Sequence, residues 1–135
     1  MKNALLFTLL CAALLVSSCA RHIIVNFQES ADSTGSIVIT PTAPIQGSVL
    51  TIDDKLLVDK KFIKKITVKN VPIGAHDIHF SADSWSYKEK ISEKATITVK
   101  PNQENAKIIT RPPFSSGYYV VYAISTLVSL FIIFR

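Results

Sequence analysis

Few side chains in this sequence have the types and spacing that chemistry needs. His76 and His79 lie three residues apart, with Asp77 and Asp83 nearby. The residues around them alternate as in a β-strand, and an odd spacing on a strand sends two side chains to opposite faces. A metal site needs ligands that converge on one point. We therefore expect no metal site here, but one turn histidine and one solvent-facing histidine.

Groups for nucleophilic or cofactor chemistry are also missing from the sequence. The chain has many serines but no Gly-x-Ser-x-Gly motif, and its four glycines are too scattered for a phosphate-binding loop. We predict no catalytic residue and no cofactor-binding residue. An enzyme is not expected.

The cysteine at position 19 follows the features of an export signal. Lys2 supplies a positive charge, residues 4–16 contain twelve apolar residues in thirteen, and Ser17 and Ser18 are small. Thirteen helical residues reach about 20 Å, which is too short for a hydrocarbon core of about 30 Å. Residues 1–18 are therefore predicted to be a cleaved signal peptide.

The sequence Val16-Ser17-Ser18-Cys19 resembles the lipobox of bacterial lipoproteins. The resemblance implies that the Cys19 thiol receives a lipid with palmitate-type acyl chains and that cleavage precedes this residue. Cys11 would be removed, so no pair remains for a disulfide. The alternative is an ordinary secretory signal that contains a cysteine. Ala20 and Arg21 are not acidic, as in lipoproteins that pass to the outer membrane.

A second apolar block closes the chain. Residues 117–134 carry no charge, three tyrosines gather at the start of this block, and Arg135 follows it. Eighteen residues fall within the range for a transmembrane helix, and tyrosines favour the headgroup layer. We expect a transmembrane helix at 117–134, after a linker at 112–116, with Arg135 in the cytoplasm. The alternative is a buried β-rich tail.

The middle of the chain has a soluble composition and is rich in β-branched residues. Segments with strand character recur about every ten residues, at 36–40, 48–52, 63–69, 75–82, 87–92, 95–100 and 106–110. Apolar and polar residues alternate at 66–69 and 78–81, so each segment has one apolar face, formed by Ile66 and Val68 or by Ile78 and Phe80. Lys65, Thr67 and Lys69 would share the face opposite Ile66 and Val68. The sequence predicts an all-β domain at residues 35–111, a small antiparallel β-sandwich or half-open barrel, with Trp85 as a cap on its core. Residues 19–34 are expected to be a tether, whose apolar patch at 23–27 could add an edge strand.

Part of this region resembles PEGA-type domains, the small transthyretin-like β-sandwiches of bacterial surface proteins. The residues that carry the resemblance are Val71-Pro72-Ile73-Gly74-Ala75-His76-Asp77-Ile78, the aromatics Trp85 and Tyr87, residues 95–99 and Pro101-Asn102-Gln103. Asp53-Asp54 stands where the family has Asp-Gly. The resemblance implies adhesion or scaffolding at the cell envelope, without catalytic residues.

A lysine-rich stretch is the strongest polar feature. It contains Lys60, Lys61, Lys64, Lys65 and Lys69, with no acidic residue between Asp59 and Asp77. One reading is contact with anionic lipid headgroups or an acidic glycan. The other is that lysines protect an exposed edge strand from pairing with other chains.

Together these features predict a non-catalytic lipoprotein of the bacterial cell membrane, with its domain in the periplasm or at the cell exterior and the outer membrane as a possible site. Its expected role is a docking or scaffolding module of a membrane-associated complex, with a protein partner. The alternative is a binding protein for anionic lipid or cell-wall glycan through the lysine-rich strand; an enzyme inhibitor is a third option. Nucleic acid is excluded by the predicted compartment.

Overall fold

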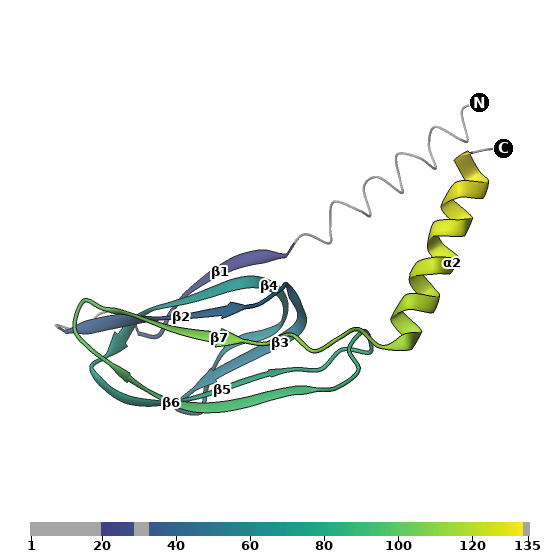
Figure 1. The fold of residues 1–135 in the computed structure, drawn as a ribbon. Coiled ribbons are helices and arrows are strands. Elements are labelled where there is room, and N and C mark those ends of the chain that lie inside the picture. Colours follow the sequence, from purple (N-terminus) through teal and green to yellow (C-terminus); the bar gives the residue numbers. More distant parts are fainter. Residues whose placement is uncertain (1–19, 29–32, 134–135) are drawn as a thin grey trace.

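The computed structural model of the protein describes residues 20–28 and 33–133 (Figure 1). Within these residues there are seven strands and one helix, labelled α2. The elements are β1 (Arg21–Asn26), β2 (Thr34–Pro41), β3 (Ile45–Ile52), β4 (Lys55–Pro72), β5 (Gly74–Ala82), β6 (Ile91–Val99), β7 (Glu104–Ile109) and α2 (Ser116–Ile133). The predicted all-β domain is thus confirmed, and we call strands β1 to β7 the β domain.

The strands form one sheet that bends around a core into a near-barrel. Its order is β6-β5-β3-β4-β2-β7, and β1 pairs with β4 outside this path. The expectation of an antiparallel sheet is wrong for two pairs, because β1 lies parallel to β4 and β2 lies parallel to β7. Only a tight hairpin forces antiparallel pairing. These two pairs join segments far apart in the chain, where alternation alone does not set the direction.

Strand β4 makes the bend. Its first half pairs with β3, and its second half lies between β2 and β1. Val58 pairs with Leu50 and Lys61 pairs with Ser48, so β4 has an extra residue in this interval, and Lys60 has a φ of 45°. Such a bulge bends a strand and increases its twist. The sequence pattern indicated only 63–69 because Lys60-Lys61 interrupts the alternation.

The core is built from alternate strand positions. Ile66 and Val68 are buried, as are Ile78 and Phe80, and this confirms the inward-facing positions that the alternation predicted. The largest fully buried side chains are Phe80, Ile37, Ile39, Ile45, Leu50, Ile52, Ile63, Ile66, Ile109, Val68, Val71 and Val99.

The segment between β5 and β6 differs from the prediction. Residues 87–92 were expected to be a strand, but Tyr87 forms only an isolated bridge with Phe114, and β6 begins at Ile91. Trp85 does not cap the core, because it is 65% exposed, whereas Tyr87 is 7% exposed. Turn-forming residues after β5 carry the chain out of the sheet at this point, which places Tyr87 rather than Trp85 over the core.

The N-terminal segment contains the edge strand that its apolar patch suggested. β1 pairs with the second half of β4, from Arg21 opposite Ile63 to Asn26 opposite Lys69. Ile23 and Val25 pack against the core. The predicted signal peptide at 1–18 and the predicted lipid site at Cys19 lie outside the described residues.

The C-terminal apolar block forms helix α2. The prediction that it crosses a membrane is not supported: among the described residues, no helix is long and apolar enough to do so. Phe134, where the predicted span ended, lies outside the described residues.

Candidate functional site

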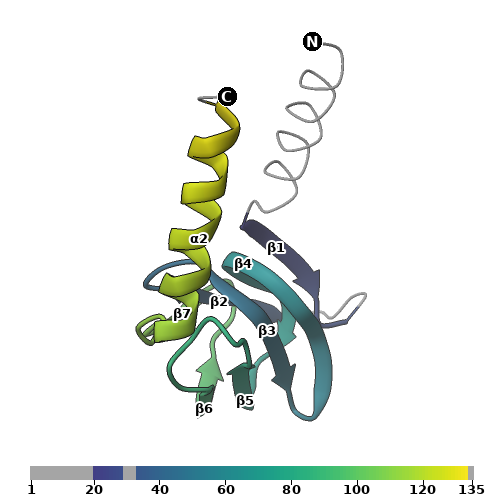
Figure 2. The same cartoon turned by 90° about the vertical axis from the view of Figure 1, so that its right-hand side faces the viewer.

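Helix α2 and the start of β1 lie at the same end of the β domain (Figures 1 and 2). Register explains this arrangement. Arg21 and Ile45 both pair with Ile63 at the bend of β4, and the neighbouring Phe62 lines a cavity with Tyr118 of α2. We call this region the helix end; it comprises Arg21, the β4 bend at 59–64, the loop at 83–90 and the base of α2.

A stacked row of aromatic rings joins α2 to the β domain. The centroids of Tyr87 and Phe114 are 5.9 Å apart, those of Phe114 and Tyr118 are 4.1 Å apart, and those of Tyr118 and Tyr122 are 6.4 Å apart. The interplanar angles are 15°, 12° and 16°. At the buried end of this row, the Tyr87 hydroxyl accepts a 2.7 Å hydrogen bond from the Gln46 N–H. The row therefore connects the core directly to the helix.

Hydrogen bonds fix the predicted linker at 112–116 against the loop at 83–90. The Ser115 N–H donates to the Ser86 carbonyl at 2.8 Å, and the Ser115 hydroxyl donates to the Trp85 carbonyl at 2.9 Å. The same Ser115 oxygen accepts from the Tyr118 N–H at 3.2 Å, as an N-cap does. Because the linker is held at both backbone and side chain, α2 keeps a defined direction relative to the β domain.

A cavity of about 250 Å³ lies beside this joint. The aromatic rings of Phe62, Tyr87, Phe114 and Tyr118 line it. Arg111 also lines it, and its guanidinium carbon lies 4.4 Å from the centroid of the Phe114 ring. Pro44, Gln46 and Ser86 complete the lining, so the cavity combines aromatic rings with polar groups and one cation.

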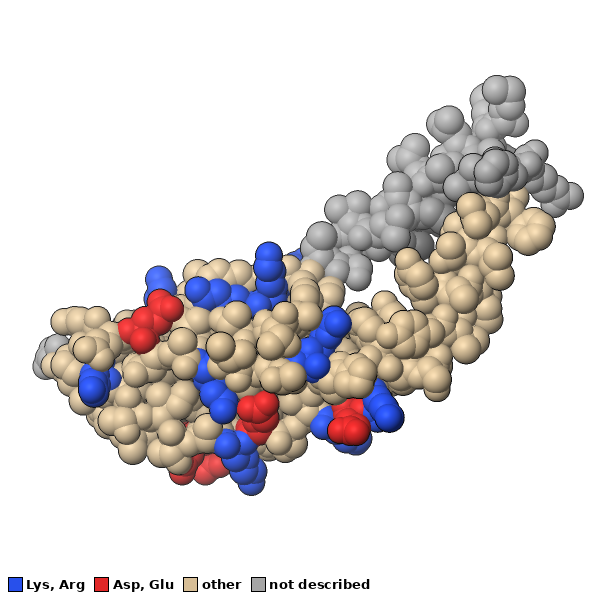
Figure 3. Space-filling model, viewed as in Figure 1, with Lys and Arg blue, Asp and Glu red and all other residues tan. Residues whose placement is uncertain are grey.

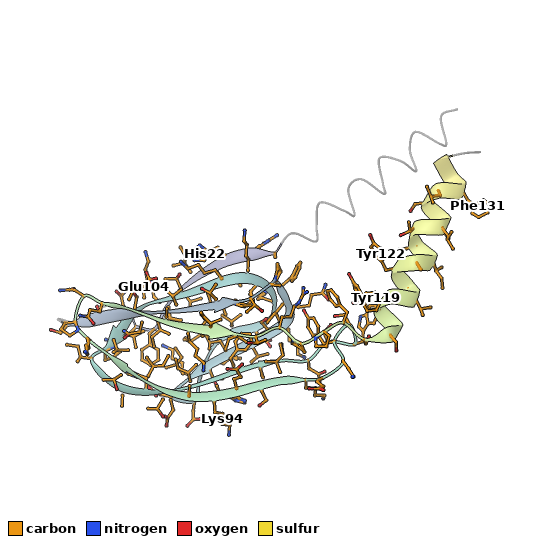
Figure 4. The ribbon with its side chains drawn as sticks, in the orientation of Figure 1. His22, Lys94, Glu104, Tyr119, Tyr122 and Phe131 are labelled. Atoms are coloured by element: carbon orange, nitrogen blue, oxygen red, sulfur yellow. The ribbon has the colours of Figure 1, made fainter. Side chains whose placement is uncertain are left out.

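The surface of α2 is apolar around the whole helix. It has no charged residue, and its exposed apolar side chains include Tyr119 and Tyr122 on one side of the helix and Phe131 on the other (Figure 4). The others are Val120, Val121, Ile124, Leu127, Val128 and Leu130. A helix that is hydrophobic on all sides is normally surrounded by apolar material. The β domain does not supply it.

The hydroxyl groups along α2 are satisfied within the helix itself. Ser125 and Thr126 both donate to the Tyr122 carbonyl at 2.8 Å, and Ser129 donates to the Ser125 carbonyl at 2.8 Å. A hydroxyl without a partner is costly in apolar surroundings. These three bonds remove that cost, so the polar residues of α2 are compatible with an apolar environment.

The structure divides the five predicted lysines into two groups. Lys60, Lys61 and Lys64 are exposed at the β4 bend and so belong to the helix end. Lys65 and Lys69 share the outward face of the second half of β4 with Thr67, opposite the buried Ile66 and Val68, as predicted. The His22 ring lies 2.9 Å from the Thr67 hydroxyl on this face. The five lysines therefore extend from the β4 bend along the second half of this strand.

Charged groups are distributed unevenly between the two ends of the β domain. At the helix end, basic side chains outnumber acidic ones, and Figure 3 shows several of them next to the uncharged α2. The basic residues there are Arg21, Lys60, Lys61, Lys64, Lys88, Lys90 and Arg111, and the acidic ones are Asp59, Asp83 and Glu89. Among the described residues, only Lys90 of this basic group forms an ion pair, with Asp83 at 2.6 Å.

The opposite end holds the other polar cluster. His76 is buried, and its Nδ1 lies 2.5 Å from a carboxylate oxygen of Asp53, while its Nε2 lies 2.9 Å from the Pro72 carbonyl. Both oxygens only accept hydrogen bonds, so both bonds form only when each ring nitrogen carries a proton. The Phe27 ring packs edge-on against His76, at 5.8 Å between centroids. The backbone carbonyl of Phe27 accepts a hydrogen bond from the Lys55 ammonium group.

Burial works to raise the pKa of Asp53, but other interactions outweigh it. The hydrogen bond from His76, the one from the Asp77 N–H at 2.9 Å and the charge of His76 hold this pKa below its ordinary value of 3.8. His79 faces the other side of β5, as its odd spacing from His76 predicted, and its Nε2 lies 3.2 Å from the Ser92 hydroxyl. These groups link β3, β5 and β6, and Asp53, Asp77 and His79 line one open cavity of about 600 Å³.

Two features of the molecule were missed from the sequence. Phe114, Tyr118 and Tyr122 recur every four residues, which places aromatic side chains on one face of a helix; this spacing was the available signal for the stacked row. For the pair of Asp53 and His76, separated by 23 residues, there was none, because a turn and a strand bring them together only in the fold.

Comparison with known proteins adds no assignment. No protein-family model and no curated protein matches the chain.

Proposed function

We propose that this protein is a bacterial cell-envelope lipoprotein, a non-catalytic docking module that joins a membrane-associated complex through α2. The observation that carries the proposal is the common position of α2 and the start of β1. Arg21 is two residues from Cys19, and two residues reach at most about 7 Å. A lipid on Cys19 would thus attach at the end from which the apolar helix projects.

The surface of α2 supports docking rather than simple attachment. Two acyl chains or more already hold a lipoprotein durably on a membrane. A rigidly joined helix with apolar side chains on every side adds a contact surface, and its three internally bonded hydroxyls suit apolar surroundings. The occupant we propose is an apolar helix of a membrane-protein partner, with the β domain in the periplasm or at the cell exterior.

The lipid site is tested with paired cysteine variants. Cells that express the full chain are labelled with radioactive palmitate, and membrane fractions are compared for the wild type, Cys19→Ser and Cys11→Ser. Wild type and Cys11→Ser should carry label and have the processed size, whereas Cys19→Ser should lose both. A processed, membrane-bound and unchanged Cys19→Ser chain would refute the lipoprotein assignment.

The docking role is tested with a photo-crosslinking amino acid. It is placed at Leu127 or Phe131, which are exposed on α2, and at Thr98 in β6 as a control. We expect the two α2 positions to give the same protein adduct in cells, and position 98 to give none. Lipid adducts alone, or equal protein adducts from all three positions, would contradict docking through α2.

The resemblance to PEGA-type domains supports a scaffolding role for the β domain within this proposal. Binding of anionic lipid or glycan by all five lysines as one surface is less favoured, because Lys69 pairs with Asn26 at the end of β1, away from the lysines of the β4 bend.

A further inference from the structure

At the helix end, charged, aromatic and apolar groups lie close to one another. The β4 bend and the start of β1, which carry exposed basic groups, lie beside the lower part of α2 (Figures 1 and 2). The rings of Trp85 and Tyr118, with centroids 6.1 Å apart, lie at the base of the helix, with Tyr119 and Tyr122 in its first two turns. The remaining residues of α2 are mostly aliphatic. Cations and aromatic rings around the first turns, followed by aliphatic side chains, match the interfacial layer and the acyl region of a bilayer.

We propose that the helix end binds anionic phospholipid headgroups of the bilayer surface through Arg21, Lys60, Lys61 and Lys64. This inference rests on the proposed function, which brings the helix end to a membrane, and it names the lipid that this end selects. It assigns the recognition to three of the five predicted lysines and adds Arg21, which the lysine pattern did not include.

The charges favour a bilayer over other partners. Among the described residues, none of these four cations has a carboxylate within 4.0 Å, so each can contact an outside anion. They lie on one side of an uncharged apolar helix (Figures 1 and 2), and a bilayer offers an anionic layer directly above an apolar one. A soluble polyanion would leave α2 and Trp85 in water.

The rigid joint makes the proposal specific. Because stacked rings and Ser115 fix α2 to the β domain, insertion of the helix would present the β4 bend, and not the far end with Asp53 and Asp54, to the headgroups. Lys69 and Lys100 lie beside the far end, where β2 pairs with the end of β4 and the β6–β7 turn lies. Lysines at the two ends are therefore predicted to differ in lipid contact.

Trp85 provides the readout, since it is the single tryptophan of the chain and lies at the helix end. The lipidated full-length mature protein is reconstituted in vesicles of phosphatidylcholine and phosphatidylglycerol. In one set the phosphatidylglycerol carries brominated acyl chains, which quench nearby tryptophan, and in the other set the phosphatidylcholine carries them. Stronger quenching by brominated phosphatidylglycerol at equal mole fraction measures a preference for anionic lipid.

Two triple variants carry the same change in charge at different ends. Lys60→Gln with Lys61→Gln and Lys64→Gln should reduce the preference for phosphatidylglycerol by about fivefold per lysine. Lys94 lines a cavity with Asp53 and Asp54 of the far end. Lys69→Gln with Lys94→Gln and Lys100→Gln should leave the preference unchanged. Added salt should weaken the wild-type preference through screening. Inorganic phosphate at matched ionic strength should have no additional effect.

Several outcomes would overturn the inference. They are absence of any preference in the wild type, equal loss in both triple variants, competition by inorganic phosphate, and a helix-end variant that aggregates but keeps its preference. The last result would assign these lysines to protection of the β4 edge. Palmitate labelling of Cys19 does not depend on these lysines, so failure of this inference is distinguishable from failure of the proposed function.

Discussion

The ring of Tyr87, buried against the core of the β domain, stacks on the ring of Phe114, which precedes α2 by two residues. The same Phe114 ring stacks on Tyr118 in the first turn of the helix. One side chain therefore sits between the core and α2. Phe114 therefore links the orientation of α2 to that of the core.

Replacement of Phe114 by alanine should release the helix from its fixed direction. Spin labels at position 98 in β6 and position 127 in α2 should give a narrow distance distribution in the wild type and a broad one in Phe114→Ala. The free energy of unfolding should fall by about 1–2 kcal/mol with the loss of two ring contacts. Phe131→Ala, at the far part of α2, serves as the control and should keep the narrow distribution. A narrow distribution in both variants would show that Ser115 alone fixes the helix.

At position 54, in the turn between β3 and β4, glycine should give a more stable fold than the native Asp54. Asp53 and Asp54 have φ values of 49° and 63°, which are the positive angles of a two-residue hairpin turn. Glycine adopts this conformation without the Cβ penalty. We expect Asp54→Gly to raise the free energy of unfolding by about 0.5 kcal/mol in urea titrations. A decrease would mean that the Asp54 side chain contributes a stabilising interaction.

Alternation of apolar residues was sufficient to predict an all-β domain and the inward positions of Ile66, Val68, Ile78 and Phe80. It was insufficient for β4, where the bulge at Lys60 breaks the period of two, and for strand direction in the two parallel pairs. The period of the apolar residues indicates which face of a strand is buried. It does not indicate which other segment of the chain pairs with that strand.

The candidate site shows the same division between local and long-range information. The lysine cluster was visible in the sequence, but the bend that places Lys61 beside β3 and Lys65 and Lys69 beside β1 depends on the fold. The aromatic spacing from Phe114 to Tyr122 was local, while the contact with Tyr87 depends on how the loop at 83–90 returns to the base of α2.

Gly35 in β2 should not accept even one additional methyl group. A Cβ at this position would lie 2.5 Å from the Lys100 carbonyl oxygen and 2.6 Å from a Val99 methyl carbon. To relieve this clash, β2 would have to move away from the turn between β6 and β7. We expect Gly35→Ala to lower the free energy of unfolding by about 2–3 kcal/mol. The matched control is Gly117→Ala, where the nearest atom would be 3.9 Å away; an equal loss in both would argue against the steric explanation.

The contact between Asp53 and His76 should make stability depend on pH in the acid range. Because the pKa of Asp53 is lower in the folded state than its ordinary value of 3.8, the unfolded state binds the proton more readily. The resulting stabilisation is present above 3.8 and is lost as the pH falls through the folded pKa. Urea unfolding of the wild type should therefore show a free energy that decreases on acidification below this value.

Asp53→Asn removes the charge but keeps an oxygen that can accept from the Asp77 N–H. At neutral pH it should cost about 1 kcal/mol, because the Asp53 carboxylate is partly exposed and its charged hydrogen bond to His76 is lost. Its unfolding free energy should then fall less steeply with acid than that of the wild type. Asp54→Asn changes the neighbouring carboxyl, which forms no ion pair among the described residues, and should retain the wild-type slope. Parallel acid slopes for Asp53→Asn and the wild type would show that this contact does not set the pH dependence.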